Sequence, residues 1–352
     1  MAPPKSPAPG PAGEPVRVNL ALQGGGAHGA FVWGVLDRLL EEPWLIVDSV
    51  CGSSAGAINA VIAASALSNG DKAVARARLA GFWEGLAGMG TVTPFRRGPL
   101  DVLLGRWSPD TSPLLAAMDF TARMVTPFDL QGPTFLPFRQ LIASSIDFDA
   151  LATGKVRVFI TATHVRTGGQ RVFDNGSIHP DALLASACLP TLFKAVQIDG
   201  EPYWDGGYHG NPNLAPLIRG STALDTILVQ INPVSRADAP LVGRDVASRI
   251  NEIAFNAALF KELRMAAMLR EASPAPDTEA GRWAAMRFHR IASESTPLLG
   301  YASKYNAEWA FFQTLRDEGR QAAQDFLDER GDALGQRSSI QPEDVLPAAY
   351  GG

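Results

Sequence analysis

The chain has 352 residues, of which 46% are hydrophobic and 19% are charged, so it can bury the core of one large domain or two ordinary ones. A formal net charge of -5 argues against a nucleic-acid partner, which would require a basic face. The two cysteines, Cys51 and Cys188, are too few for a disulfide framework and lack metal-ligand spacing. A reducing compartment, the cytoplasm, is therefore expected.

The N-terminal stretch and the longest apolar run exclude two classes of segment. Residues 1–15 are rich in proline and glycine and contain no apolar core of a signal peptide, which predicts a disordered arm. The longest nearly apolar run covers residues 55–67. It is too short to span a bilayer and suits a buried helix.

Strand-like and helix-like patterns alternate along the first ninety residues. A β-branched run at 16–22 ends in glycines, and an apolar helical pattern follows until Pro43. A second strand at 44–50 runs into "CGSSAG", and a small-residue helix begins near Ser54. A further helix is expected at 71–86. This order is typical of an α/β fold with a parallel sheet.

Prolines and aromatic residues interrupt this pattern at 88–149, where we expect an insertion or lid within a single domain at 16–330. The α/β pattern then resumes and includes a hairpin that turns at Asp199-Gly200. The expected elements are strands at 155–165, 170–174, 225–233 and 283–291, helices at 179–190, 245–271 and 304–330, and a hairpin over 195–207. Residues 331–352 are expected to form a C-terminal tail.

The glycine-rich loop after the first strand has two interpretations. Gly24-x-Gly26-x-x-Gly29 satisfies the dinucleotide-binding fingerprint, and Asp48 lies at about the right distance to hold a ribose. A Walker-type loop is excluded because Ala30 comes directly after Gly29. The second interpretation depends on the turn at the end of the second strand.

That strand ends in Gly52-Ser53-Ser54-Ala55-Gly56, a G-x-S-x-G pattern between a strand and a helix. Such a turn is so tight that the positions two before and two after the serine need almost no side chain, and it exposes the serine hydroxyl at the carboxyl end of the sheet. An attack by Ser54 on a carbonyl creates an oxyanion, which preorganised amides stabilise by about 3 kcal/mol each. The backbone amides of the glycine loop are therefore expected to stabilise the transient negative charge of this oxyanion.

A serine nucleophile needs a proton acceptor, and the sequence leaves two candidates open. Of the five histidines, His209 has the most suitable context, in "WDGGYHGNP". The neighbouring Asp205 comes after a short strand and would project at a strand end. Asp-Gly-Gly is also a common turn, so the residues alone do not decide.

Several motifs together resemble the patatin-like phospholipase family. They are "LQGGGAHGAFVWGVL", "CGSSAGAINA", "SACLPTLFKAVQIDGEPYWDGG" and "QINP", in this order between Val16 and Pro233. The resemblance implies a three-layer α/β/α fold around a mostly parallel sheet, and a Ser–Asp dyad in which Ser54 is the nucleophile and Asp205 the base. The implied oxyanion donors are Gly24, Gly25, Gly26 and Ala27, with supporting motif positions at His28, Gly29, Gly52, Gly56, Gly206 and Gly207.

One position departs from the family pattern. The family's loop usually reads G-G-G-x-[RK]-G, whereas this chain has His28 at the cationic position. At a helix N-terminus a histidine should be mostly neutral, which puts a preference for phosphate headgroups in doubt and leaves acyl-ester hydrolysis intact. An equal alternative is that His28 only orders the loop.

The resemblance implies hydrolysis of fatty-acyl esters of lipids without a metal or organic cofactor. The implied partner is a lipid or other acyl ester, with room for peripheral contact with a membrane, and the oligomeric state stays open. Two other classes are retained: a nucleotide-binding oxidoreductase that uses the glycine loop, and a non-catalytic lipid-binding protein. Acyl transfer to another alcohol is an alternative within the hydrolase interpretation.

Overall fold

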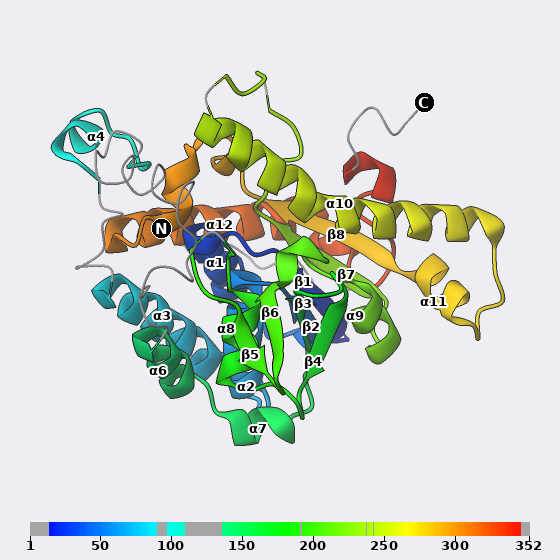
Figure 1. The fold of residues 1–352 in the computed structure, drawn as a ribbon. Helices are drawn as coiled ribbons and strands as arrows, with labels where there is room; N and C mark the ends of the chain where they lie inside the picture. Colours follow the sequence, from blue (N-terminus) through cyan, green and yellow to red (C-terminus); the bar gives the residue numbers. More distant parts are fainter. Residues whose placement is uncertain are drawn as a thin grey trace, which may run out of the picture.

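The computed structural model describes residues 14–89, 97–109, 136–190, 192–236, 238–241 and 243–345. An 8-stranded sheet with the order β5-β6-β3-β2-β1-β7-β8 forms its centre, and β4 pairs with β3 outside this path (Figure 1). The strands are β1 (Val16–Leu22), β2 (Leu45–Gly52), β3 (Arg157–His164), β4 (Gln170–Asp174), β5 (Val196–Ile198), β6 (Glu201–Asp205), β7 (Asp225–Gln230) and β8 (Arg287–Ala292).

Helices connect and cover these strands. The α-helices are α1 (Gly29–Leu39), α2 (Ala55–Leu67), α3 (Lys72–Met89), α4 (Pro99–Leu103), α6 (Leu136–Ser145), α7 (Phe148–Ala152), α8 (Pro180–Ser186), α9 (Ala215–Gly220), α10 (Gly243–Ala272), α11 (Glu279–Ala285) and α12 (Trp309–Arg330). The 3-10 helices are η1 (Gly26–His28), η3 (Gly206–Tyr208), η4 (Thr296–Leu298), η5 (Tyr301–Tyr305), η6 (Gly331–Ala333) and η7 (Pro342–Val345).

The order of the strands reverses at one point in the sheet. Strands β3, β2, β1, β7 and β8 are parallel, whereas β4 and β6 run antiparallel to β3. The chain moves outward in opposite directions from β1 and from β7. Ligand sites in open α/β sheets lie at the carboxyl ends of the strands where the order reverses in this way.

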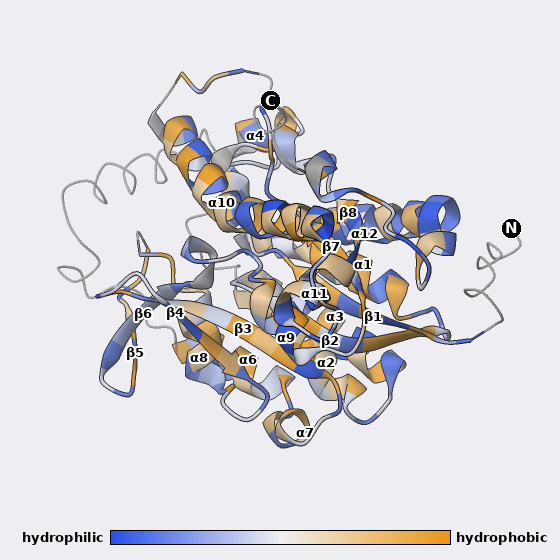
Figure 2. Cartoon of the chain, turned by 90° about the vertical axis from the view of Figure 1, so that its right-hand side faces the viewer, coloured by the Kyte–Doolittle hydropathy of each residue, from blue (hydrophilic) through white to orange (hydrophobic). Residues whose placement is uncertain are grey.

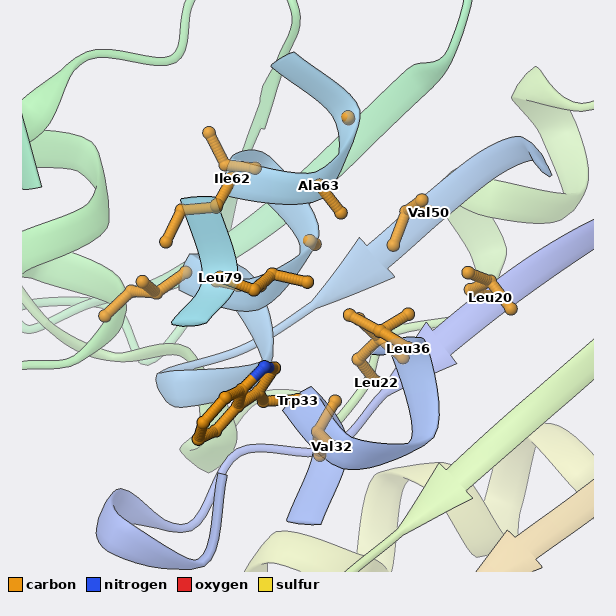
Figure 3. Close-up of a cluster of buried hydrophobic side chains, with 14 of the residues drawn as sticks. Leu20, Leu22, Val32, Trp33, Leu36, Val50, Ile62, Ala63 and Leu79 are labelled. Carbon is orange, nitrogen blue, oxygen red and sulfur yellow. The ribbon is translucent and has the colours of Figure 1, made fainter. Parts of the chain in front are cut away.

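Alternate side chains of each strand supply two separate cores. Leu20, Leu22 and Val50 point into a core that also contains α1, α2, α3 and α12, where Trp33 and Leu36 pack (Figure 3). Their neighbours Ala21 and Cys51 point the other way, into a core with α9, α10 and α11. Because strand side chains alternate with a period of two, each face buries its own set. The expected three-layer α/β/α fold is confirmed.

The structure corrects the expected elements at Trp283 and Lys304, and it describes part of the expected tail. Trp283, placed in a strand, lies in α11, and the strand begins only at Arg287. The helix expected from Lys304 begins at Trp309, and Lys304 itself lies in η5. Residues 331–345 of the expected tail are ordered against the domain: the amides of Ser339 and Ile340 bond to the Phe288 carbonyl at the free edge of β8.

The expected insertion is described only in part. Within it, α6 packs beside α3 and α8, and α4 exposes several leucine and valine side chains. Residues 90–96 and 110–135 of this segment, and 1–13 of the expected N-terminal arm, lie outside the described residues. In the described part of the chain, no helix combines the length and apolarity needed to cross a bilayer.

Candidate active site

Ser54 stands on a strained turn between β2 and α2. Its φ of 55° lies in the left-handed region, which non-glycine residues rarely adopt. The turn is tight because a Cβ on Gly52 would come within 2.5 Å of the Gly56 carbonyl carbon. The Ser54 amide donates to the Ser186 hydroxyl at 3.0 Å, whereas the Ser54 hydroxyl makes no capping bond to α2. The strained turn thus presents the Ser54 hydroxyl without a hydrogen bond from it to the helix.

Asp205 lies level with Ser54 at the same edge of the sheet. Gly52 pairs with Ile160 of β3, and Asp205 of the antiparallel β6 pairs with Ala162, two residues further along the same strand. The Asp205 side chain is fully buried, and its Oδ1 accepts the Gly207 amide at 2.7 Å. The hairpin turn at Asp199-Gly200, which the sequence predicted, is what returns the chain to this position.

The second oxygen of this carboxyl group is unoccupied. Among the described residues, Asp205 Oδ2 has no hydrogen-bond partner. Burial raises the pKa of Asp205 to about 7, against the opposing effects of the Gly207 amide and the Ser54 hydroxyl. The Ser54 hydroxyl therefore lies near enough to stabilise the carboxylate, although no hydrogen bond of ordinary length and angle joins the two groups.

The glycine loop touches the serine and is clamped by asparagines. A Cβ on Gly24 would lie 2.5 Å from the Ser54 Cβ. Asn211 accepts from the Gly24 amide at 2.7 Å and donates to the Gly24 carbonyl at 3.0 Å, and Asn232 donates to the same carbonyl at 2.8 Å. The buried Gln23 side chain bonds to the backbone of Asn211 and Asn232 and to Asn256 of α10. This network fixes the loop before any substrate arrives.

The amides of the loop fall into two groups. Those of Gly24 and His28 are occupied, by Asn211 and by the Gly25 carbonyl at 3.3 Å. Within the described residues, the amides of Gly25, Gly26 and Ala27 have no hydrogen-bond acceptor. Occupation of its amide removes Gly24 from the expected oxyanion donors.

His28 is buried and turned toward η5. Its Nε2 lies 2.8 Å from the Ser303 hydroxyl, and its ring packs edge-on against Phe311. Burial lowers the pKa of His28 to about 3, with Lys304 and Arg236 adding to the shift. The prediction of a neutral imidazole is confirmed, but burial is the cause and not the helix terminus.

No histidine has a hydrogen bond to Ser54 in the described part of the chain. The ring of His209 lies 3.4 Å from the Gly168 carbonyl, and His164 lies between Thr167 and Glu201. His179 packs edge-on against Phe173, and His289 bonds to Asp225. Among the described residues, Asp205 is thus the titratable group beside Ser54 that could act as a general base.

The remaining predicted positions pack around the same turn. Gly29 abuts Ala55, and Gly206 abuts the Thr161 carbonyl of β3 and lies near the Ser53 hydroxyl. Sequence reasoning missed Ser186 and the residues that clamp the loop, Gln23, Asn211, Asn232 and Asn256. The motifs "SACLP", "HGNP" and "QINP" carry three of them, but only the folded chain shows what they touch.

Asp48 does not serve the glycine loop. Its carboxylate accepts the Thr222 amide at 3.0 Å and the Ser221 hydroxyl at 2.8 Å, both just before β7 begins. The side chain therefore lies toward the amino ends of the strands. The nucleotide-binding interpretation loses the acidic residue that it needs to hold a ribose.

One protein family and two solved structures are similar to this chain. The family model described as patatin-like phospholipase matches residues 20–218, which include the glycine loop, the serine turn and Asp205.

Among solved structures, VipD from Legionella pneumophila is similar at 14% identity and a TM-score of 0.38, covering 90% of this chain and 67% of VipD. The type III effector protein ExoU is similar at 18% identity and a TM-score of 0.32, covering 90% of this chain and 53% of ExoU, so the chain spans about half of that protein. No curated protein matches the chain. Because the family model covers more than half of its residues, the chain belongs to the patatin-like phospholipase family.

Proposed function

We propose that this protein is a serine acyl hydrolase that cleaves fatty-acyl esters of lipids through a Ser54–Asp205 dyad. The observation that carries the proposal is the pairing of a strained, uncapped Ser54 with a buried carboxyl group whose second oxygen is free. A general base works best when its pKa lies near the working pH, and burial raises the pKa of Asp205 to about 7. The carboxylate can then accept the serine proton directly.

The reaction proceeds in two halves. Asp205 takes the hydroxyl proton as Ser54 Oγ bonds to the ester carbonyl carbon, and the oxyanion that forms meets the free loop amides of Gly25, Gly26 and Ala27. The C–O bond to the alcohol then breaks, Asp205 returns its proton to the alcohol, and an acyl-enzyme remains. In the second half, water gives its proton to Asp205 and attacks the acyl carbon, and the proton returns to Ser54 as the acid leaves.

Peripheral contact with a lipid surface is part of this proposal. The helix α10 carries both hydrophobic and hydrophilic residues (Figure 2). Its side chains Val246, Ile250 and Ile253 are 39%, 60% and 55% exposed, and their spacing places them on one helical face. Asn256, one turn further along the same helix, bonds to Gln23 beside the glycine loop. Flotation with phosphatidylglycerol vesicles tests the contact: Ile250→Glu with Ile253→Glu should reduce binding several-fold, and undiminished binding would refute it.

Hydrolysis of a lipid panel tests the proposed activity. Wild-type protein should release fatty acid from phospholipid or neutral glyceride and should turn over p-nitrophenyl butyrate. Ser54→Ala should lower both activities by about 10³-fold or more, since it deletes the nucleophile. Ser53→Ala is the matched control, because Ser53 adjoins Ser54 but donates its hydroxyl to the Gly210 carbonyl. Retained activity in Ser54→Ala would assign the chemistry to another residue.

A further inference from the structure

Lys304 lies in η5, whose backbone packs directly against the glycine loop. A Cβ on Gly26 would collide with the Lys304 carbonyl oxygen and lie 3.7 Å from the Lys304 Cβ. The preceding residue, Ser303, holds His28 of the same loop. The Lys304 side chain therefore starts at the loop that touches Ser54, and its flexible stem can carry the ammonium to a group bound there.

Among the described residues, the corner of the molecule around Lys304 contains the cations Arg236 and Arg249 and the carboxylate Glu252. The Glu252 side chain is fully buried, and its oxygens lie 2.6 Å from Arg236 and 3.3 Å from Arg249. Although burial raises it, hydrogen bonds from Arg236 and the nearby Lys304 charge hold the pKa of Glu252 below its ordinary value. The one carboxylate is thus ionised and already shared by two arginines.

Among the residues that the structure describes, the Lys304 ammonium has no hydrogen bond and no carboxylate within ion-pair distance, although the side chain is half-buried. The carboxylate that acts on its charge from further away is Glu252, which already pairs with two arginines. Burial lowers the pKa of Lys304, with Glu252 opposing and Arg236 adding to the shift. A partly buried cation whose counter-charge is shared with two arginines is costly, and an anionic ligand would lower that cost.

We propose that Lys304 binds the phosphate group of an anionic phospholipid whose acyl ester lies at Ser54, with Arg236 adding to the positive potential. The inference rests on the proposed function, because it assigns the headgroup of the same substrate. The neutral His28 supplies no charge of its own to this corner. A lysine is a suitable point charge for a phosphate, and a free phosphate ion has the same chemistry as the headgroup.

Calorimetric binding to the Ser54→Ala protein tests this site without requiring turnover. The probes are monomeric dihexanoyl phosphatidylglycerol and its neutral counterpart dihexanoylglycerol. The anionic lipid should bind about tenfold more tightly, and adding Lys304→Met should abolish most of this preference. Lys304→Arg should restore part of it, and Lys261→Met, on the exposed side of α10, should leave it unchanged. Failure of the proposed function would appear separately, as absent turnover by the wild type.

The outcomes separate the sources of phosphate and the rival explanations. If millimolar inorganic phosphate displaces the anionic lipid in a Lys304-dependent manner, the site accepts free phosphate; if only the lipid binds, it is specific for the headgroup, and both results support the site. An equal loss of affinity for both lipids in Lys304→Met would reveal a merely structural role and overturn the proposal. Should that variant not fold, equal affinity of Ser54→Ala protein for the two lipids would overturn it.

Discussion

The buried aspartates Asp205 and Asp225 have different surroundings: Asp225 bonds to a histidine that lies beside a serine, whereas Asp205 lies beside Ser54 directly. Asp225 Oδ1 lies 2.9 Å from His289 Nε2, and His289 Nδ1 lies 3.0 Å from the Ser339 hydroxyl. This is the hydrogen-bond order of a Ser–His–Asp triad. Asp205 lies beside Ser54, and among the described residues no histidine bonds to either group.

The two carboxyl groups differ in what already occupies them. Arg287 and the Gly335 amide also bond to Asp225, so, although burial raises it, these bonds and the one from His289 hold its pKa below the ordinary value. Asp205 has one amide partner and a free oxygen, and burial raises its pKa to about 7. A stabilised carboxylate is a weak base, whereas a destabilised one readily takes a proton.

The two sites also differ in position. Asp225 is the first residue of β7, at the amino end of the parallel strands, where the 335–340 segment covers it. Asp205 and Ser54 lie at the carboxyl edge, beside a loop with free amides. A triad-like order of bonds is therefore no evidence of catalysis when the bonds of the carboxylate are already taken up by the fold.

Asp205→Asn should have the largest effect of the substitutions that separate the two sites. Removing the base should lower kcat/KM by about 10³-fold, because the amide cannot accept the serine proton. Steady-state hydrolysis of p-nitrophenyl butyrate measures this. The matched variant Asp225→Asn should lower the melting temperature but leave kcat/KM per folded molecule within about twofold. A crippling effect of Asp225→Asn, His289→Ala or His209→Ala on the folded enzyme would break the comparison.

Asn211→Ala should have the next largest effect. It removes both bonds that hold Gly24, so the loop amides lose part of their preorganisation, and kcat should fall about 10- to 100-fold with a smaller change in KM. The same ester assay measures both parameters. Asn213→Ala is the control, because Asn213 is a near neighbour that bonds to Gln170 and not to the loop. Equal effects of the two changes would contradict the proposed role of Asn211 in holding the glycine loop.

The pH dependence of activity should follow Asp205. Because the base must be ionised, kcat/KM should rise about tenfold per pH unit in the acid range and level off above pH 7, near its raised pKa. A profile that is flat between pH 5 and 8 would contradict a buried carboxyl base.

Stability should change with pH in the opposite direction. The folded-state pKa of Asp205 is about 7 and the ordinary value is 3.8, so between them the folded protein holds a proton that the unfolded chain has released. This group's contribution to the free energy of unfolding should therefore fall as pH rises from about 4 to 7, by about 1.4 kcal/mol per pH unit. Urea unfolding of wild type and Asp205→Asn at pH 5 and 7 measures the difference, and identical pH slopes would contradict the shift.

Local patterns predicted most of the fold because they reflect local physics. The β-branched run at 16–22, the turn pair Asp199-Gly200 and the G-x-S-x-G turn each have one sterically favoured conformation, and all three formed as expected. The short apolar stretch at Trp283 has no such constraint. A Thr278 side-chain cap, which accepts the Gly281 amide, makes it helical instead of extended.

The residues that support the site could not be predicted from the sequence, for a different reason. Asn211 contacts Gly24 across 187 residues of sequence, and no local pattern encodes such a contact. The periodicity of the sequence assigns Lys304 to a long α-helix. In the structure Lys304 lies in η5, so this prediction placed it on the wrong element. Residue types predicted the candidate reactive groups, whereas only the folded chain shows which residues hold them in place.

Covalent labelling with a fluorophosphonate probe, followed by peptide mapping, tests the central claim most directly, because the probe reacts only with an activated serine. Both candidate serines, Ser54 and Ser339, compete in the same experiment. We expect a stoichiometric adduct on Ser54 in the wild type, none in Ser54→Ala, and much slower labelling of Ser54 in Asp205→Asn. An adduct on Ser339, or no adduct on the folded wild-type protein, would contradict this expectation.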